Sequence, residues 1–493
     1  MNRDLNLNFV RERVEPWDFI VIGGGATGAG CALDAATRGF SVLLLEQHDF
    51  GKGTSSRSTK LVHGGVRYLR QGNVSLVRES LRERGLLLQN APHVVHKQEF
   101  IIPCYGLWEK IFYGLGMKIY DLLAGKLSFD RSRVINRGEV LERLRNIDSQ
   151  DRSGGVLYYD GQFDDTRLLI DILRTASAHG AAVLNYARVV GLRKSESGRI
   201  DGLDFEDIEN GTRYSISAKA VINATGAFCC AIQEMSDANS KPVLAYSQGV
   251  HLVFDRKFLP RETALMIPKT SDGRVLFCIP WLDHVLVGTT DTPVELPELE
   301  PRALEQEVEF ILETASGYLT SKPERTDILS VFAGVRPLIK RGNAVTSSLS
   351  RSHELFVDGS GLVTITGGKW TTFRQMAENA VDRAAEEAGL EKGRCVTASL
   401  PIDPPETVES AEPIHPKIKL TRSEVFRAVH DEMARTVEDV LARRSRALFL
   451  DAAAAIELAP AVAEIMAVEL GRDDQWIVKQ IDNFHSVAKS YTI

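Results

Sequence analysis

Residues 18–46 read DFIVIGGGATGAGCALDAATRGFSVLLLE, a short apolar run, a glycine-rich turn, an alanine-rich stretch and a second apolar run. This order is typical of a strand, a turn, a helix and a second strand. We expect the strands at 18–22 and 41–46, and the helix to end before Gly39. The crossover of a βαβ unit joins two parallel strands and is right-handed. The opening segment therefore predicts an α/β fold with a parallel sheet.

The turn inside this segment has the spacing of a dinucleotide-binding site. Gly23, Gly25 and Gly28 satisfy G-x-G-x-x-G, and Glu46 follows 18 residues after the last of them. The first glycine permits a tight turn, the second lets the backbone approach a pyrophosphate, and the third lets the helix pack closely on the strand. The helix N-terminus supplies N–H donors for the anion, and Glu46 would accept a hydrogen bond from a ribose hydroxyl.

Two further stretches favour a flavin over a nicotinamide. Residues 51–59, GKGTSSRST, follow the acidic strand directly, and their small polar side chains suit a buried, extended cofactor. A second glycine pair, Gly367 and Gly368, precedes Lys369 between a predicted strand at 362–366 and a predicted helix from Trp370. Two distant glycine turns indicate one cofactor bound at both ends, so we expect FAD rather than NAD.

The composition is that of a folded, globular protein. The 493 residues suffice for about three domains, or for a large two-domain enzyme with an appendage. With 44% hydrophobic and 25% charged residues, general disorder, collagen and coiled coil are excluded. The net charge of −7 argues against a main role in binding nucleic acid. The six cysteines have no zinc-site spacing and suit a reducing compartment, so we expect no metal.

The first residues carry charges of both signs and no secretory apolar core, and no stretch supplies about 20 apolar residues for a bilayer span. We therefore expect a cytoplasmic protein.

The remainder of the chain predicts a mixed sheet and a separate helical unit. Further strands are predicted at 182–190, 220–223, 275–280, 285–288 and 355–366. Five prolines between 401 and 416 predict a linker, because proline interrupts regular elements. Thr421 and Glu424 then form a T-x-x-E capping box, with Leu420 and Val425 as its hydrophobic staple. A helix should begin at Arg422 and place Val425, Val429 and Met433 on one face.

Seven runs carry a resemblance that reaches over nearly the whole chain, from about residue 18 to 451. They are GGGATGAG with Glu46, TSSRSTKLVHGGVRYL (54–69), VINATG (221–226), VGTTD (287–291), GVRPL (334–338), GGKWTTFR (367–374) and EDVLARRSRALFLD (438–451). In this order they resemble the flavin-dependent glycerol-3-phosphate dehydrogenases. The opening glycines are shared with many flavoproteins, whereas KLVHGGVRYL and GGKWTTFR together are specific to this family.

The resemblance implies oxidation of sn-glycerol 3-phosphate to dihydroxyacetone phosphate, with electrons passing to FAD and then to membrane quinone. It also implies a fold of the glutathione-reductase and glycine-oxidase type. The expected domains are a discontinuous FAD-binding domain (17–90, 155–242 and 330–395), a substrate- and membrane-facing domain (91–154 and 243–329), a linker (401–417) and a C-terminal helical domain (418–493).

The same resemblance assigns candidate site residues. The catalytic candidates are Arg67, His251, Arg336 and Lys369, and the substrate-binding candidates add Tyr68, Thr290 and Arg351. The cofactor candidates are Gly23, Gly25, Ala26, Thr27, Gly28, Glu46, Thr54, Ser55, Ser56, Lys60, Leu61, His63, Gly65, Ala224, Thr225, Gly226, Gly368, Lys369, Trp370 and Thr371. Oxidation of the alcohol also needs a base for the hydroxyl proton. His251, Lys369 and His63 are the candidates, unranked.

A segment at 107–123 has an interfacial pattern. Trp108, Phe112 and other apolar residues recur at helical spacing, with Lys110 and Lys118 beside them. Such a helix would lie in the headgroup region of a membrane, where quinone is found. The alternative is a helix that buries its stripe on the protein's own core. We expect peripheral association with the inner face of the cytoplasmic membrane, and a homodimer is compatible with this interpretation.

Two departures from the family bear on these expectations. The connection between the GGK helix and the helical domain is shorter than in its members, and the insertion typical of oxygen-dependent members has no counterpart here, which favours quinone. Two alternatives stay open. One is an oxidase or dehydrogenase of another anionic hydroxy or amino acid, and the other is a flavin-binding protein without turnover.

Overall fold

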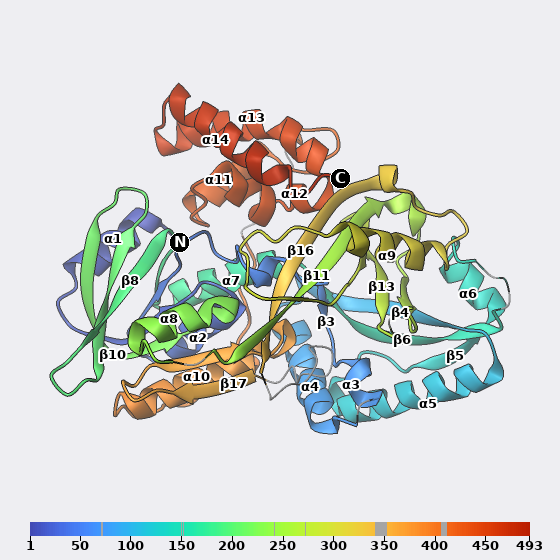
Figure 1. The fold of residues 1–493 in the computed structure, drawn as a ribbon, viewed down its shortest axis with the longest axis horizontal. Coiled ribbons are helices and arrows are strands. Elements are labelled where there is room, and N and C mark those ends of the chain that lie inside the picture. The colour runs from blue at the N-terminus through green and yellow to red at the C-terminus, as the bar shows by residue number, and fades with distance from the viewer. Residues whose placement is uncertain are drawn as a thin grey trace.

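The computed structural model describes residues 1–70, 72–148, 150, 152–240, 242–271, 273–340, 353–405 and 412–493, without the side chains at 67 and 70. These residues form two β-sheets side by side, and a group of helices from the C-terminal part of the chain lies above their junction (Figure 1). The chain crosses between the sheets several times, so neither sheet is built from one continuous segment.

The first sheet has the parallel centre that the opening segment predicts. Its strands are β1 (Trp17–Ile22), β2 (Val42–Leu45), β7 (Ala182–Leu184), β8 (Ala187–Lys194), β9 (Ile200–Asp207), β10 (Arg213–Asn223), β17 (His353–Val357) and β18 (Val363–Gly367). β1 lies between β2 and β10 and is parallel to both, and β7 and β18 continue this arrangement outward. β17 forms an antiparallel edge, and the β8–β9 hairpin pairs with the first half of β10.

Two stretches that the sequence predicts as single strands are pairs of strands. The stretch at 182–190 divides into β7 and β8 because Tyr186 has a φ of +53°, which extended backbone does not allow. The stretch at 355–366 divides into β17 and β18 around a turn in which Gly361 has a φ of +86°. The strands predicted at 220–223, 275–280 and 285–288 are confirmed.

Both faces of the first sheet are covered, which is typical of parallel sheets. Phe19 and Val21 of β1 pack under the helices α2 (Ala26–Thr37), α7 (Asp165–Ala178) and α10 (Phe373–Glu387). Ile20 and Ile22 face the opposite core, with the β8–β9 hairpin and the helices α1 (Arg3–Glu12) and α8 (Cys229–Ser236). The alternation along β1 therefore supplies two cores at once.

The second sheet is largely antiparallel and mixes strands from distant parts of the chain. Its strands are β3 (Leu61–Val62), β4 (Val95–Cys104), β5 (Arg133–Asn136), β6 (Gly154–Phe163), β11 (Leu244–Asp255), β12 (Ala264–Ile267), β13 (Leu276–Trp281), β14 (His284–Gly288), β15 (Thr292–Val294) and β16 (Ile328–Ile339). β3, β6 and β16 belong to this sheet, whereas the predicted domain division places them with the FAD-binding segments. Pairing partners far apart in sequence, β6 for β3 and β11 for β16, determine this membership.

Helices cover this sheet on both faces. α3 (Val66–Arg70), α4 (Val74–Asn90) and α5 (Leu107–Ala124) pack on one face, and α6 (Arg137–Arg143) and α9 (Glu305–Ser316) pack on the other. α3 and α4 follow directly after β3, so the segment 61–70 connects this sheet with the helices beside it.

The C-terminal unit is helical, as predicted. It contains α11 (Arg422–His430), a π-helical segment (Asp439–Arg444), α12 (Ala447–Leu450), α13 (Ala452–Leu470) and α14 (Asp474–Ala488). The capping box is confirmed, because the Glu424 carboxylate accepts from the Thr421 N–H at 2.9 Å and the Thr421 hydroxyl accepts from the Glu424 N–H. Val425 and Val429 face the core. Met433 does not share their helix: α11 ends earlier, Met433 has a φ of +57°, and its side chain packs in the core of the first sheet.

Buried ion pairs attach this unit to the first sheet. Arg443 and Arg444 both bind Asp49, and Arg446 contacts Asp165 at 3.2 Å. All five side chains are at most 3% exposed. The C-terminal unit therefore fixes the segment that follows β2, which lines the candidate site.

Candidate active site

The glycine turn after β1 brings backbone against the first of two pockets. Gly23 has a φ of +107°, and a Cβ on Gly28 would lie 1.9 Å from the Gly23 carbonyl oxygen. Only glycine at position 28 therefore lets α2 begin this close to β1. Ala26 and Thr27, in the first turn of α2, line the pocket, where the helix N-terminus favours an anion.

Glu46 lines the same pocket at the end of β2. Its carboxylate accepts hydrogen bonds from the Gly24 N–H at 2.7 Å and from the His48 N–H at 2.8 Å. Burial raises the pKa of Glu46, and these two amide donors oppose that shift. The predicted bond to a ribose hydroxyl would use the remaining acceptor positions of a carboxylate whose orientation the backbone already fixes.

The first pocket has a volume of about 260 Å³ and lies at the carboxyl ends of the parallel strands. The predicted cofactor residues that line it are Gly23, Gly25, Ala26, Thr27, Glu46, Thr54, Ser55, Ala224, Thr225 and Gly226. Open backbone at the glycine turn, a helix N-terminus and a carboxylate for a ribose are together what the adenosine diphosphate part of FAD needs. The residues present therefore fit this cofactor.

The second glycine turn connects the first pocket with the second one. Gly367 and Gly368 both have positive φ, +76° and +72°. In the short 3-10 turn that follows, Trp370 Nε1 donates to the Ser55 carbonyl at 2.9 Å, and the hydroxyl of Thr371 accepts from the His63 N–H at 3.1 Å. Ser55 lines the first pocket and His63 the second, so this turn holds both together.

Lys369 does not line either pocket. Its Nζ binds the Ser80 hydroxyl on α4 and lies 5.0 Å from the centre of the Tyr68 ring. Tyr68 itself lines the second pocket, so the lysine lies just behind the pocket wall.

The second pocket, of about 130 Å³, lies between the segment after β3 and the second sheet. The predicted residues that line it are Leu61, His63, Gly65, Tyr68, Thr290 and Arg336. The Arg336 guanidinium donates to the Thr290 carbonyl at 3.0 Å and to the Thr289 hydroxyl at 2.9 Å. Neighbours with oxygen acceptors thus fix a positive charge at the pocket, where an anionic group could bind it.

His251 lies behind the wall of this pocket. It is only 1% exposed and is stacked on Phe332, with ring centres 5.0 Å apart. Its Nε2 lies 2.9 Å from the hydroxyl oxygen of Thr59, which lines the pocket. Burial, followed by the charges of Arg336 and Lys60, holds the pKa of His251 well below its usual value. The imidazole is therefore neutral near pH 7.

Lys60 lines neither of the two pockets. Its side chain is fully buried, and its Nζ donates to the Ser56 carbonyl at 2.7 Å and to the Asp165 carboxylate at 2.6 Å. Burial is the main cause that lowers the pKa of Lys60 to about 7. The side chain of Lys60 thus binds a carboxylate of the protein itself, and its backbone has a φ of +61°.

Other predicted residues fall outside the two pockets or outside the described residues. Gly28, Ser56 and Gly368 shape the turns without lining a pocket. Arg351 and the side chain of Arg67 lie outside the described residues.

More than half of the residues that line the two pockets are not among the predicted ones. Thr59 lies inside a quoted motif, so its position was available, but nothing local indicates its contact with His251. Asp291, the last residue of the VGTTD run, also lines the second pocket and was not predicted to do so. Asp160 and Arg274 come from β6 and from the loop before β13, and no motif marks them.

Comparison with known proteins places this architecture among flavoenzymes. The family described as FAD dependent oxidoreductase matches residues 18–374, and the C-terminal domain of alpha-glycerophosphate oxidase matches residues 364–477. The probable mitochondrial glycerol-3-phosphate dehydrogenase of Caenorhabditis elegans is 40% identical over 514 residues, covering 93% of this chain and 71% of that protein. The mitochondrial glycerol-3-phosphate dehydrogenase of Arabidopsis thaliana is 44% identical over 402 residues, covering 79% and 64%.

A solved structure agrees with these sequence matches. The glycerol-3-phosphate dehydrogenase of Bacillus halodurans, complexed with FAD, has a TM-score of 0.78 and 28% identity, with 99% of this chain and 97% of that chain covered. This chain spans 71% and 64% of the lengths of the two mitochondrial relatives.

Proposed function

Since the chain belongs to the family of FAD-dependent glycerol-3-phosphate dehydrogenases, we propose that it oxidises sn-glycerol 3-phosphate to dihydroxyacetone phosphate and passes the electrons to a membrane quinone. The bound flavin supplies the two-electron acceptor for this oxidation. The observation that carries the proposal is the pair of adjoining pockets: one fits the adenosine diphosphate part of FAD, and the other contains the fixed guanidinium of Arg336.

Arg336 is the described group best placed to recognise the substrate phosphate. A guanidinium offers a planar fork to a phosphate, and two oxygen acceptors already hold this one in position. Thr290, which supplies one of those acceptors, is in turn bound through its hydroxyl to Glu307 at 2.8 Å. Because hydrogen bonds already hold Arg336 and Thr290 in place, these side chains lose little conformational entropy when an anion binds.

The hydroxyl proton of the substrate needs an acceptor near the same pocket. Burial lowers the pKa of His251, so the imidazole is neutral and has one unprotonated ring nitrogen, although the lower pKa also makes it a weaker base than a free imidazole. Its Nε2 lies beside Thr59, which lines the pocket. Lys369 is bound to Ser80 behind the pocket wall, and His63 lines the pocket. We favour His251, with its neutral imidazole, as the acceptor of this proton.

Anaerobic mixing of the yellow holoenzyme with sn-glycerol 3-phosphate, glycerol or a small hydroxy acid tests this function. We expect the first compound alone to bleach the oxidised-flavin band, because only it carries both the phosphate and the secondary alcohol. Re-oxidation should be fast with a quinone analogue and slow with air. Bleaching by the hydroxy acid or an amino acid instead would favour the alternative substrates, and no bleaching by any of them would favour a flavin-binding protein without turnover.

We also propose that the protein associates peripherally with the inner face of the cytoplasmic membrane through α5. The apolar stripe predicted at 107–123 is exposed rather than packed on the core: Trp108 is 74%, Leu115 62% and Leu122 79% exposed. The opposite side of the same helix buries Met117 and Tyr120. This is the arrangement of an amphipathic helix that exposes an apolar face able to bind another surface.

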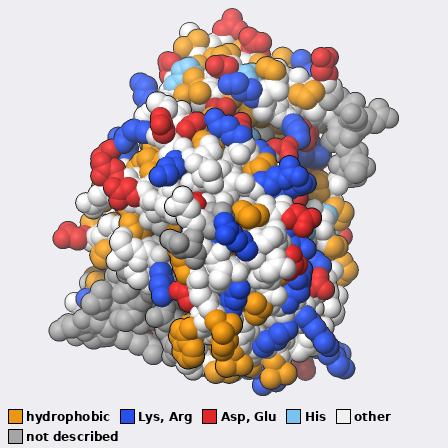
Figure 2. Space-filling model, turned by 90° about the vertical axis from the view of Figure 1, so that its right-hand side faces the viewer, with side chains coloured by type: hydrophobic (Ala, Val, Ile, Leu, Met, Phe, Trp, Pro, Cys, Tyr) orange, Lys and Arg blue, Asp and Glu red, His pale blue; other side chains and the backbone are white. Residues whose placement is uncertain are grey.

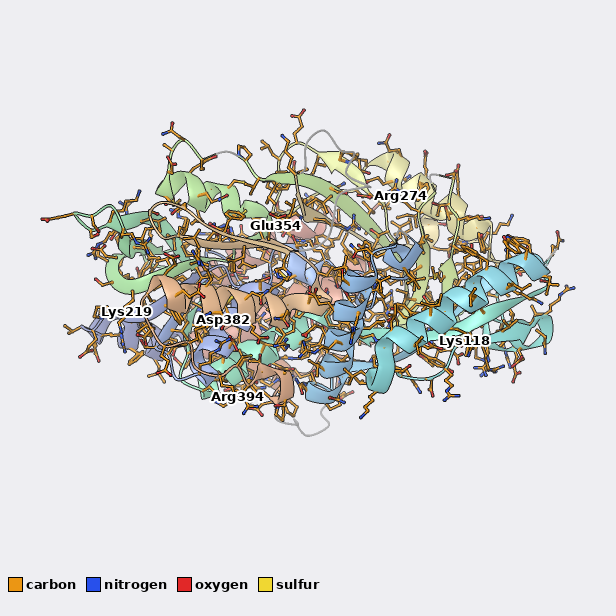
Figure 3. The ribbon with its side chains drawn as sticks, turned by 90° about the horizontal axis from the view of Figure 1, so that it is seen from below. Lys118, Lys219, Arg274, Glu354, Asp382 and Arg394 are labelled. Carbon is orange, nitrogen blue, oxygen red and sulfur yellow. The ribbon has the colours of Figure 1, made fainter. Side chains whose placement is uncertain are left out.

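The surroundings of α5 favour an anionic lipid surface as that partner. Figure 2 shows hydrophobic side chains gathered at the lower end of this face, with Lys and Arg side chains beside them. Seen from below, α5 lies along the surface with Lys118 on it (Figure 3). Lys126, Arg131 and Arg133 are exposed nearby. Among the described residues, no helix is long and apolar enough to cross a bilayer.

Flotation with lipid vesicles tests this attachment. We expect the holoenzyme to float with vesicles that contain anionic lipid, and the variant Leu115→Glu to lose most of that binding. The matched control is Val478→Glu on α14, where an apolar side chain is also exposed, at 59%, but far from α5 (Figure 1). Equal binding by both variants would count against α5.

A further inference from the structure

Thr59 stands between the second pocket and the buried His251. Thr59 lines the pocket, whereas His251 does not, and the Oγ1 of Thr59 lies 2.9 Å from His251 Nε2. The two residues are 192 positions apart in the sequence. A proton that leaves a molecule in the pocket for this histidine therefore meets the threonine hydroxyl first.

The turn that carries Thr59 is fixed on both sides. Before it, the Ser58 hydroxyl donates to the Asp165 carboxylate at 2.7 Å. After it, Lys60 has a φ of +61° and binds the same carboxylate at 2.6 Å. Because its two neighbours share one buried anchor, Thr59 has little freedom to turn away from the histidine.

The imidazole is fixed as well. His251 lies on β11 opposite Gly288 of β14, and a Cβ on Gly288 would lie 2.4 Å from the histidine Cδ2. Phe332 of β16 stacks on the ring at an interplanar angle of 18°. Among the described residues, no hydrogen-bond partner is found for Nδ1. The Nε2 atom is thus the ring nitrogen that communicates with the pocket.

The other threonine hydroxyls of the pocket are engaged elsewhere. Thr290 donates its hydroxyl proton to Glu307 at 2.8 Å and accepts from the Val250 N–H at 3.0 Å. The Thr289 hydroxyl accepts from Arg336 at 2.9 Å. Thr59 is the threonine of the described pocket wall whose hydroxyl reaches His251.

We propose that Thr59 is a catalytic residue that relays the substrate's hydroxyl proton to His251. The inference rests on the function proposed above. The O–H bond of the secondary alcohol breaks and its proton goes to Thr59 Oγ1, while the proton that Thr59 carried forms a new N–H bond at His251 Nε2. The carbinol carbon loses its hydrogen as a hydride, with two electrons, to the FAD of the family reaction. The alcohol becomes a ketone, and the proton stays on the imidazole until it is released.

Two variants of the holoenzyme separate a relay from a packing role. Thr59→Val keeps the shape and removes the hydroxyl, whereas Thr59→Ser keeps the hydroxyl. In anaerobic single turnovers we expect the valine variant to reduce its flavin about 100-fold more slowly, within the range of general acid–base effects, and the serine variant to stay within about threefold of wild type. The dissociation constant of sn-glycerol 3-phosphate should change by no more than about threefold in either. A valine variant with the wild-type rate, or a serine variant as slow as valine, would overturn the relay.

A double variant tests whether the two residues act as one unit. Adding His251→Asn to Thr59→Val should slow flavin reduction no further than the slower single variant, because both remove the same proton path. If the double variant instead slowed flavin reduction by the product of the two single effects, Thr59 and His251 would act independently and the relay would be overturned.

A measurement without turnover completes the test. Holoenzyme labelled with 15N-histidine, with His251→Asn to assign the signal, reports the imidazole tautomer by NMR. The relay requires Nδ1–H with Nε2 as the acceptor, and Thr59→Val should shift the Nε2 resonance. An Nε2–H tautomer in the wild type would refute the relay, whatever the substrate is. Failure of sn-glycerol 3-phosphate to bleach the wild-type flavin would instead refute the proposed substrate.

Discussion

Replacement of Asp165 by asparagine tests the buried charge cluster that supports the site. The carboxylate is fully buried and accepts from Lys60 at 2.6 Å, from the Ser58 hydroxyl at 2.7 Å and from Arg446 at 3.2 Å. Asp165→Asn keeps the shape and removes the carboxylate that both buried cations contact, which leaves Arg446 the longer contact with Asp164 at 3.7 Å. Breaking a buried ion pair from one side costs about 3–5 kcal/mol of unfolding free energy.

The penalty should depend on pH because Lys60 titrates. The pKa of Lys60, about 7, lies below that of a lysine in the unfolded chain. The contribution of this group to the free energy of unfolding of the wild type therefore rises as the pH increases above about 7, and it does not change below pH 7. Without Asp165, which raises that pKa, the lysine of the variant loses its proton at still lower pH. As the pH falls below 7, the free energy of unfolding of the variant therefore keeps decreasing, by up to about 1.4 kcal/mol per pH unit, whereas that of the wild type stays level. Asp165 itself has a lowered pKa and titrates outside this window.

Urea denaturation of the holoenzyme at pH 6, 7 and 8, in the same excess of FAD, measures the penalty. We expect Asp165→Asn to lower the free energy of unfolding by about 3–5 kcal/mol at pH 6, and by about 1 kcal/mol less than that at pH 8. The control is Asp130→Asn, which removes an exposed carboxylate paired with Lys97 and should cost less than about 1 kcal/mol. A penalty for Asp165→Asn no larger than the control's, or larger at pH 8 than at pH 6, would refute this reasoning.

Three further variants test other parts of the structure. Gly28→Ala should abolish FAD retention, seen in the absorbance of the purified protein, because its Cβ would lie 1.9 Å from a carbonyl oxygen; Gly359→Ala, with nothing within 4 Å, should retain FAD. Arg336→Lys should raise the sn-glycerol 3-phosphate concentration for half bleaching by about tenfold or more at unchanged FAD content, since lysine lacks the planar fork; unchanged half bleaching would exclude this arginine from anion recognition. Tyr491→Phe should destabilise the protein by about 1–2 kcal/mol and speed proteolysis of the C-terminal unit, because its hydroxyl bonds Arg57 at 2.5 Å; wild-type proteolysis would contradict that role.

Local signals in the sequence predicted the elements whose stability is itself local. The βαβ opening, the capping box at Thr421 and the helix that follows it depend on neighbours within a few residues, and the structure has all three. The glycine spacing likewise predicted the first pocket, because glycine is required wherever the backbone itself must approach a ligand. Motifs also placed Arg336 and Thr290 in the second pocket.

Local patterns do not reveal a residue's environment where it depends on segments far away. Nothing near Lys60 in the sequence indicates that its Nζ binds Asp165, 105 positions away. Met433 continues the spacing of Val425 and Val429, but its helix ends earlier and the side chain enters another core. The exposed stripe of α5 has the same periodicity as a buried one, and only the packing of the helix shows which side is covered.

The sequence by itself thus determined the fold class, the cofactor-binding turn, the family and part of the lining of the two pockets, because each is encoded in short patterns of spacing and residue type. The tertiary structure alone decided that β3, β6 and β16 join the second sheet and that Thr59 meets His251 across 192 residues. The physical reason is that spacing fixes backbone conformation and one buried face, whereas the partner of that face is chosen by the packing of the whole chain.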